Sequence, residues 1–306
     1  MGTGLHATFS MTESTTRQPH ERNKEGKGSY TSVNRLTMYY EIHGTGKPLV
    51  LLHGGLATID MMFGQLLPPL AQTRQVIAVE LQAHGHTADI ERPLSFELMA
   101  DDIAALIKHL GFEHADIFGY SLGGGVALQT AIRHPEVVRK LVVASAPYKR
   151  DGWYPEVLAG MASMNAEAAE AMVGSPVHQA YVSVAPKPED WSALVAKLGQ
   201  LLRQDYDWST AVAAIKAPTL LVIGDADSVR PAHTVEMFGL LGGGKAITSP
   251  PERVGAMGGL PNSQLAVLPG TTHFSILTRT DLLLPIITSF LNAPVPILGL
   301  EAKRDV

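Results

Sequence analysis

Short apolar runs, separated by polar turns rich in glycine and proline, recur along most of the chain. The runs are rich in Val, Ile and Leu, which is typical of strands buried in a parallel sheet. Expected strands cover residues 35–42, 48–52, 75–81, 114–118, 138–144, 218–223 and 265–268. Between strands, apolar residues recur every three or four positions, which predicts helices over 95–110, 122–133 and 281–291. This alternation predicts an α/β fold with a mostly parallel, doubly wound sheet.

Residues 148–212 interrupt the alternation, because they contain helical patterns and no convincing strand. The segment holds all three tryptophans, Trp153, Trp191 and Trp208. Two interpretations stay open: the aromatic side chains fill a small core of their own, or they line a substrate pocket under a lid. The expected organisation is a polar leader (1–29), a core (30–147 and 213–292) with a long loop at 242–263, a helical cap (148–212) and a tail (293–306).

Composition narrows the classes of function. The chain has 306 residues, of which 45% are hydrophobic and 17% charged, as expected for a globular protein with a substantial core. A net charge of −5 without a long basic run argues against nucleic acid or an anionic membrane surface as the main partner. The absence of cysteine excludes disulfides and thiolate chemistry. Without an apolar stretch of membrane-spanning length or a signal-peptide core, we expect a cytoplasmic protein.

The pentapeptide Gly119-Tyr120-Ser121-Leu122-Gly123 lies between an expected strand and an expected helix. A serine hydroxyl becomes an effective nucleophile when it is exposed, has a base nearby and has donors for the developing oxyanion. The two glycines allow a sharp turn that exposes Ser121. The helix N-terminus directs free backbone N–H groups towards it. We therefore predict Ser121 as nucleophile and the Leu122 N–H as an oxyanion donor; the alternative is a structural glycine-rich turn.

A second oxyanion donor is expected after an earlier strand, in the sequence LVLLHGGLA. Gly55 is the predicted donor, with Leu56 as the alternative, because glycine lets the backbone approach a substrate oxygen. His53 ends a buried strand and precedes the serine. We interpret it as a structural residue that hydrogen-bonds the loop rather than as a catalytic base.

The base and its orienting acid are expected after the last two strands. His273 follows the last strand, and Asp225 and Asp227 follow the strand before it. A carboxylate there can accept the second ring N–H of His273, fixing its tautomer and stabilising the imidazolium. The chain order Ser121, acid, His273 is the one expected for this sheet topology.

From about residue 30 to residue 292 the chain resembles the α/β-hydrolase superfamily, in the motifs LLHGG, GYSLGG, HPEVVRKLVV, GDADSVRP and PGTTH. The resemblance implies that the orienting acid stands three residues after the strand-end glycine Gly224, which is Asp227. Asp225 remains the alternative and otherwise a loop-capping carboxylate. The turn ELQAHGHT departs from the commoner pattern with Asp and Arg, and no catalytic role is carried onto it.

The same resemblance limits the chemistry. Dehalogenases and epoxide hydrolases of this fold use an aspartate nucleophile, whereas position 121 is serine. Hydrolysis of esters, thioesters or lactones, C–C hydrolysis of diketones and perhydrolysis remain, and the chain is also similar to esterases that open macrolide antibiotics. We expect a small-molecule ester or lactone substrate, no metal or organic cofactor, and substrate contacts from Tyr120, Leu56, Trp153 and Met161. A small-molecule receptor of the same fold is the non-enzymatic alternative.

Overall fold

A single eight-stranded sheet forms the centre of the computed structural model, which describes residues 28–246 and 262–295. Its strand order is β1-β2-β4-β3-β5-β6-β7-β8. The strands span Gly28–Val33 (β1), Leu36–His43 (β2), Lys47–Leu52 (β3), Arg74–Val79 (β4), Ala115–Tyr120 (β5), Val138–Ala144 (β6), Thr219–Ala226 (β7) and Ser263–Thr272 (β8). β1 pairs antiparallel with β2, and β2 with β4; the other neighbouring strands run parallel. The predicted mostly parallel sheet is confirmed.

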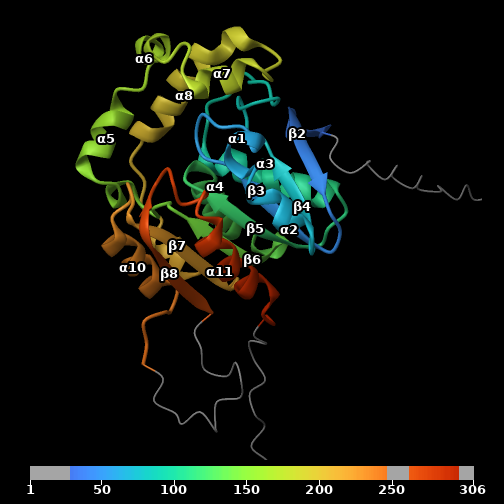
Figure 1. Ribbon diagram of the computed structural model, residues 1–306, viewed down its shortest axis with the longest axis vertical. Coiled ribbons are helices and arrows are strands. Elements are labelled where there is room, and N and C mark those ends of the chain that lie inside the picture. The colour runs from blue at the N-terminus through green and yellow to red at the C-terminus, as the bar shows by residue number, and fades with distance from the viewer. Residues whose placement is uncertain (1–27, 247–261, 296–306) are drawn as a thin grey trace, which may run out of the picture.

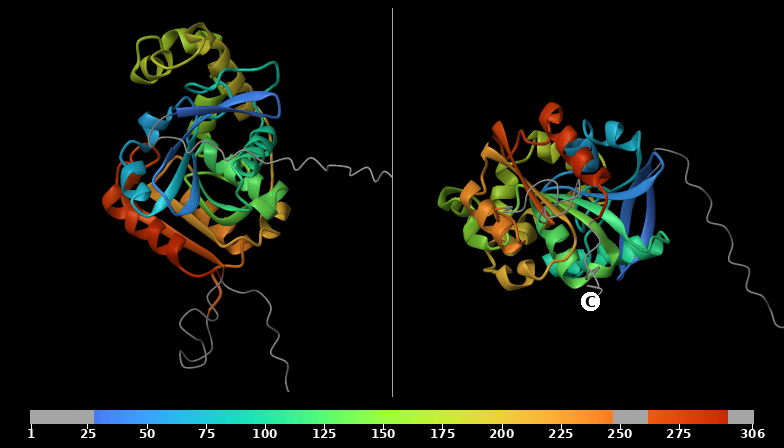
Figure 2. Two further views of the ribbon diagram at one scale, coloured as in Figure 1. Left: turned by 90° about the vertical axis from the view of Figure 1, so that its right-hand side faces the viewer. Right: turned by 90° about the horizontal axis from the view of Figure 1, so that it is seen from below.

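Helices cover both faces of this sheet, so the fold is doubly wound (Figure 2). α1, α2 and α11 pack on one face, and α3, α4 and α10 on the other. The helices are Ile59–Phe63 (α1), Leu67–Ala71 (α2), Phe96–His109 (α3), Leu122–Arg133 (α4), Pro155–Ala162 (α5), Ala166–Ala171 (α6), Pro176–Val182 (α7), Trp191–Arg203 (α8), Ser209–Ala213 (α9), Pro231–Leu240 (α10) and Thr280–Asn292 (α11). Among the described residues, no helix is long and apolar enough to cross a membrane.

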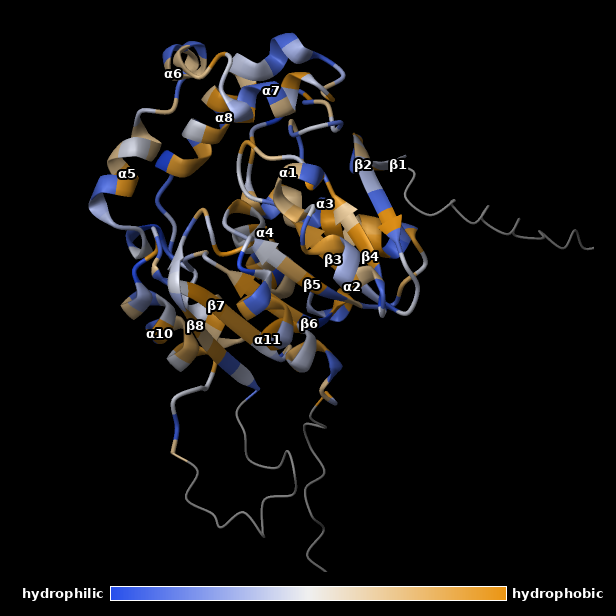
Figure 3. Ribbon diagram, viewed as in Figure 1, coloured by the Kyte–Doolittle hydropathy of each residue, from blue (hydrophilic) through white to orange (hydrophobic). Residues whose placement is uncertain are grey.

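The order of the strands reverses between β3 and β5, and this reversal positions the site. β3 pairs with β4 on one side and with β5 on the other, and both pairings are parallel. The middle strands are mostly hydrophobic because they are buried on both faces (Figure 3). In open α/β sheets, ligands bind beyond the carboxyl ends of the strands at such a reversal. The segments that follow β3 and β5 are therefore expected to carry the site.

The edge strand β1 was not predicted. It begins at Gly28, inside the predicted leader of residues 1–29, and pairs with β2 from Gly28 opposite Glu41 to Val33 opposite Leu36. Most of its side chains are exposed or half-buried, and only Thr31 and Val33 are buried. An edge strand with so few buried positions lacks the apolar run by which the central strands were found.

Residues 145–218, all of them described, add no strand to the sheet, and α5 to α8 gather beyond one end of it (Figure 1). The aromatic residues of this segment have different surroundings. Trp191 belongs to a small core of this cap: its Nε1–H donates to the carbonyl of Ala169 at 3.0 Å, and its ring lies 5.4 Å from that of Tyr181. Trp153 instead faces the sheet, where its ring meets that of His273 edge to face at 5.4 Å.

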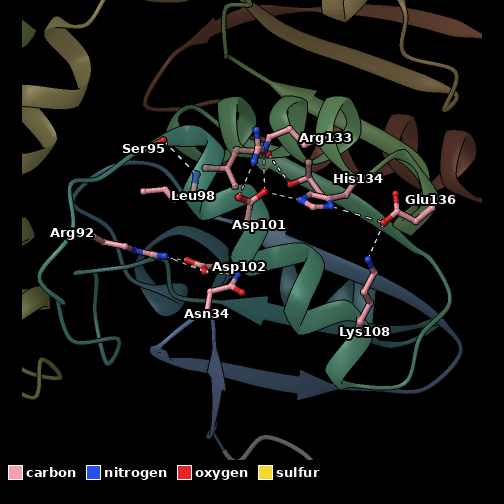
Figure 4. A network of polar contacts seen from close by, with 12 residues as sticks. Asn34, Arg92, Ser95, Leu98, Asp101, Asp102, Lys108, Arg133, His134 and Glu136 are labelled. Carbon is pink, nitrogen blue, oxygen red and sulfur yellow. Dashed lines mark hydrogen bonds and ion pairs between the residues drawn. The ribbon is translucent and has the colours of Figure 1, made fainter.

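A polar network ties α4 to α3 (Figure 4). Asp101 on α3 accepts two hydrogen bonds of 2.9 Å from Arg133, and His134 contacts the same carboxylate at 2.7 Å. The next residue of α3, Asp102, forms an ion pair with Arg92. The Asp101–Arg133 pair is partly exposed, and pairs of this kind contribute little stability, about 0–1 kcal/mol each. The contacts of Asp101 with Arg133 and His134 hold the C-terminal end of α4. Ser121, the nucleophile candidate, stands at the N-terminal end of the same helix.

Three predicted segments fall wholly or partly outside the described residues. They are the leader up to residue 27, residues 247–261 of the predicted loop and the tail from residue 296. At its far end the predicted loop 242–263 meets β8, which begins at Ser263.

Candidate active site

Ser121 stands at the turn between β5, which ends at Tyr120, and α4, which begins at Leu122. Its backbone has φ 53° and ψ −116°, a left-handed conformation that non-glycine residues rarely adopt. A Cβ atom at Gly119 would lie 2.2 Å from the carbonyl oxygen of Gly123, and one at Gly123 would lie 2.2 Å from that of Leu52. The turn is therefore closed only because both flanking positions lack a side chain.

Three predicted residues come together at this turn. The Oγ of Ser121 lies 3.1 Å from Nε2 of His273, and Nδ1 of His273 lies 2.9 Å from Oδ1 of Asp227. Because a carboxylate can only accept, Nδ1 carries the proton shared with Asp227, and Nε2 is left to accept the proton of Ser121. The side chains of His273 and Asp227 are buried, whereas Ser121 is half-buried and accessible.

The carboxylate of Asp227 is held in its charged form by its neighbours. Burial alone raises its pKa, but the hydrogen bond and charge of His273, with hydrogen bonds from Ser145 and Val229, outweigh burial and hold the pKa below its ordinary value. Asp225 has a different environment: it is exposed and accepts backbone N–H bonds from Gly270 and Thr271. The geometry thus favours Asp227 as the orienting acid and Asp225 as a loop cap.

Sequence reasoning missed Ser145, which supports Asp227 from the neighbouring strand. Its Oγ–H donates to Oδ2 of Asp227 at 2.6 Å, and its backbone has a positive φ of 52° directly after β6. The side chain is fully buried. The sequence does show a small hydroxyl residue directly after an expected strand. It does not show that this strand lies next to the strand that Asp227 follows, because the order of strands is known only from the sheet.

The predicted oxyanion donors lie beside Ser121. At the start of α4, the N–H of Gly123 donates to the carbonyl of His53, whereas the Leu122 N–H has no acceptor among the described residues. The N–H groups of Gly55 and Leu56 likewise donate to none of the described acceptors. The loop after β3 passes close to Ser121, since a Cβ atom at Gly54 would lie 3.5 Å from that of Ser121. These free N–H groups are suited to receive an oxyanion.

His53 is buried behind this loop rather than facing Ser121. Its Nε2 accepts the N–H of Leu81 at 3.1 Å, so Nδ1 carries the ring proton and donates to the carbonyl of Gly54 at 2.7 Å. Burial, together with the nearby ring of His84, lowers the pKa of His53 to about 3. This neutral ring supports the loop that carries Gly55, which is the structural role expected for it.

Acid should destabilise the fold through its buried neutral histidines. His84 is also fully buried, and burial lowers its pKa to about 4. Unfolded histidines take up protons near pH 6.5, so below that pH the unfolded chain binds more protons and the free energy of unfolding falls as the pH falls. At pH 4.5 we expect His53 and His84 each to remove about 2 kcal/mol relative to pH 7, measured by urea denaturation.

A matched variant isolates one of these groups. In the native protein, Nδ1 of His84 lies 2.9 Å from the carbonyl of Gln82 and donates to it, while Nε2 has no partner among the described residues. His84→Asn keeps a donor for that carbonyl and removes the titrating ring. Its free energy of unfolding should fall about 2 kcal/mol less between pH 7 and pH 4.5 than that of the native chain. An equal fall in both proteins would contradict the assignment.

A cavity of about 300 Å³ opens at Ser121 and His273. It lies between the sheet and the cap, and its lining includes Leu56, Trp153 and Met161, whose contacts with substrate stay a prediction. Tyr120 does not line it: this buried side chain donates its hydroxyl to the carbonyl of His273 at 2.5 Å. That position corrects the substrate contact predicted for Tyr120, because successive residues of a strand point to opposite faces.

The described residues contain no group of three or more His, Asp or Glu side chains arranged to hold a metal ion. Among the described residues, the polar side chains that line the cavity are those of Ser121, Tyr206, Ser228 and His273, together with Trp153 through its indole N–H. Chemically, the arrangement offers a nucleophile, a base and free N–H donors at the end of an apolar cavity.

Comparison with known proteins agrees with this architecture. A family model described as alpha/beta hydrolase fold matches residues 47–175. A pimeloyl-[acyl-carrier protein] methyl ester esterase of Neisseria meningitidis is 44% identical over 118 residues, which cover 38% of this chain and 43% of that protein. The chain thus spans less than half the length of that relative.

Two further comparisons extend over more of the molecule. A protein of the same name from Aeromonas hydrophila is 30% identical over 228 residues, covering 66% of this chain and 86% of the relative. The solved structure of a carboxylesterase from Bacillus subtilis superposes with a TM-score of 0.68 over 89% of this chain and 94% of that chain, at 19% identity. The latter is a likeness of fold alone.

Proposed function

Since the chain belongs to the α/β-hydrolase family, we propose that it is a serine hydrolase that cleaves carboxylic esters, lactones included, through an acyl-enzyme. One observation carries the proposal: Ser121 Oγ lies 3.1 Å from a histidine whose other ring nitrogen lies 2.9 Å from a buried carboxylate. The relatives from Neisseria and Aeromonas, both named methyl ester esterases, support the same reaction class.

The proposed reaction follows from these positions. Ser121 Oγ attacks the ester carbonyl while Nε2 of His273 takes its proton, and Asp227 stabilises the resulting imidazolium. The N–H groups of Leu122 and Gly55 receive the oxyanion. His273 then protonates the leaving alcohol as the C–O bond breaks. Water, deprotonated by the same nitrogen, attacks the acyl-enzyme, and the acid product leaves as Ser121 regains its proton.

A substrate panel tests this function against its alternatives. We expect a p-nitrophenyl ester and a small lactone each to gain one water by mass spectrometry, over many turnovers and equally in EDTA. The panel also contains a macrocyclic lactone, which tests the resemblance to macrolide esterases, and a vinylogous diketone. Turnover of the diketone alone would assign C–C hydrolysis instead. At most one turnover of any substrate would indicate a receptor.

A further inference from the structure

The cavity beside Ser121 is lined almost entirely by apolar side chains. Apart from the polar groups named above, its described walls are Leu, Val, Met, Phe, Trp, Pro, Ala and Gly residues, and no Asp, Glu, Lys or Arg side chain among the described residues lines it. A charged group placed in such a cavity would lose its water without gaining a partner, which is strongly unfavourable. An apolar group would gain from leaving water. The cavity therefore favours uncharged, apolar groups over charged ones.

One glycine of the cap lines this cavity without a packing reason. Gly160 lies within α5, where glycine is less favourable than alanine, and its φ is not in the left-handed region. A Cβ atom at Gly160 would meet no atom within 4 Å. Two other cavity glycines differ: a Cβ at Gly55 would lie 2.8 Å from Leu198, and one at Gly125 would lie 2.5 Å from Phe96.

Gly160 lies at the open end of the cavity. The residue is exposed although it lines the cavity, so it lies where the cavity opens to solvent. Phe274, the neighbour of His273, also lines the cavity and is 85% exposed. The open end is therefore bounded by the cap on one side and by the loop that carries His273 on the other. A side chain at position 160 would occupy space at this end.

We propose that the cavity binds uncharged, apolar esters and that Gly160 is a specificity-determining residue that keeps its open end wide enough for long ones. The proposal rests on the ester hydrolysis proposed above. The proposal predicts that a charge at the far end of a substrate slows its hydrolysis. It also predicts that a larger side chain at position 160 slows the hydrolysis of long esters and has little effect on the smallest ones.

The first test compares esters of equal length that differ in charge. Methyl octanoate and octyl acetate lengthen the acyl and alcohol sides, with ethyl acetate as the short reference. We expect kcat/KM for at least one long ester to exceed that for ethyl acetate by about 100-fold or more, because each methylene that leaves water contributes about four-fold. The matched ester with a terminal carboxylate, monomethyl octanedioate or ω-acetoxyoctanoate, should be about 100-fold poorer or worse.

The second test fills the open end. Gly160→Leu should lower kcat/KM for the favoured long ester by about ten-fold or more and leave ethyl acetate within about two-fold. Gly239→Leu is the matched control, because Gly239 also lies in a helix, is exposed, has no atom within 4 Å of a Cβ and does not line the cavity. Both changes replace glycine in a helix with a better helix former, so both variants should fold.

Each other outcome decides against a defined part of the proposal. Equal rates for neutral and charged long esters would overturn selection on charge, and equal losses on short and long esters would overturn the role of Gly160. If no ester is hydrolysed, the proposed function fails. The preference of the cavity for uncharged molecules is then tested by the binding of two amides that differ in charge. Trp153 lines the cavity, so its fluorescence should change with octanamide and not with the monoamide of octanedioic acid; the same response to both would overturn the inference.

Discussion

Replacing Ser121 with alanine is expected to lower kcat for p-nitrophenyl acetate by about 10⁴-fold or more, because the change removes the nucleophile and leaves only the oxyanion donors and binding. The backbone of residue 121 already has a positive φ of 53°. Alanine keeps a Cβ in this position, so the strain is unchanged and the loss is confined to one hydroxyl. The assay is steady-state release of p-nitrophenol at neutral pH.

Two controls separate chemistry from folding. Ser183→Ala removes an exposed hydroxyl at the end of α7, where it donates to the carbonyl of Ala180 at 2.8 Å, and should leave kcat unchanged. Circular dichroism and the thermal midpoint of Ser121→Ala should match those of the native chain. If Ser121→Ala retained near-native kcat, Ser121 would not be the nucleophile, and the proposed function would fall with it.

The central strands could be predicted from the sequence because burial on both faces produces continuous apolar runs. The run predicted over 138–144 coincides with β6, and the run over 48–52 lies within β3. β1 could not be predicted in this way, because only two of its side chains are buried. The antiparallel position of β2, between β1 and β4, also left no local signal, because pairing direction depends on contacts between distant segments.

The residues of the candidate site could be located from the sequence because each of them is expected at the end of a strand. Ser121, Asp227 and His273 each follow a strand, and parallel strands bring their carboxyl ends to one edge of the sheet. Tyr120 was placed wrongly in the pocket because it adjoins Ser121 in sequence, whereas the pleat of β5 turns its side chain to the loop behind His273. Ser145 was missed because its partner is 82 positions away in the chain.

The acid of the site can be identified by a matched pair of changes. Asp227→Asn should lower kcat by about 10⁴-fold, because the amide can present a donor to Nδ1 of His273 and favour the wrong tautomer. It also removes the charge that stabilises the imidazolium. Because hydrogen bonds from His273 and Ser145 help hold the pKa of Asp227 below its ordinary value despite burial, the native carboxylate is ionised at neutral pH and the substitution removes a full charge.

Asp225→Asn makes the same chemical change two positions away and should leave kcat within about three-fold. The native Asp225 side chain is exposed, and it accepts the N–H of Gly270 on Oδ2 at 2.9 Å and the N–H of Thr271 on Oδ1 at 3.2 Å, so asparagine keeps an acceptor for only one of the two bonds. The loss of the Asp225 carboxylate should instead lower the thermal midpoint slightly, because this carboxylate caps the loop before His273. The reverse result, with Asp225→Asn inactive and Asp227→Asn active, would mean that the loop rearranges in solution so that Asp225 orients His273. Comparable large losses in both would show that the loop, rather than one carboxylate, sets the position of the histidine.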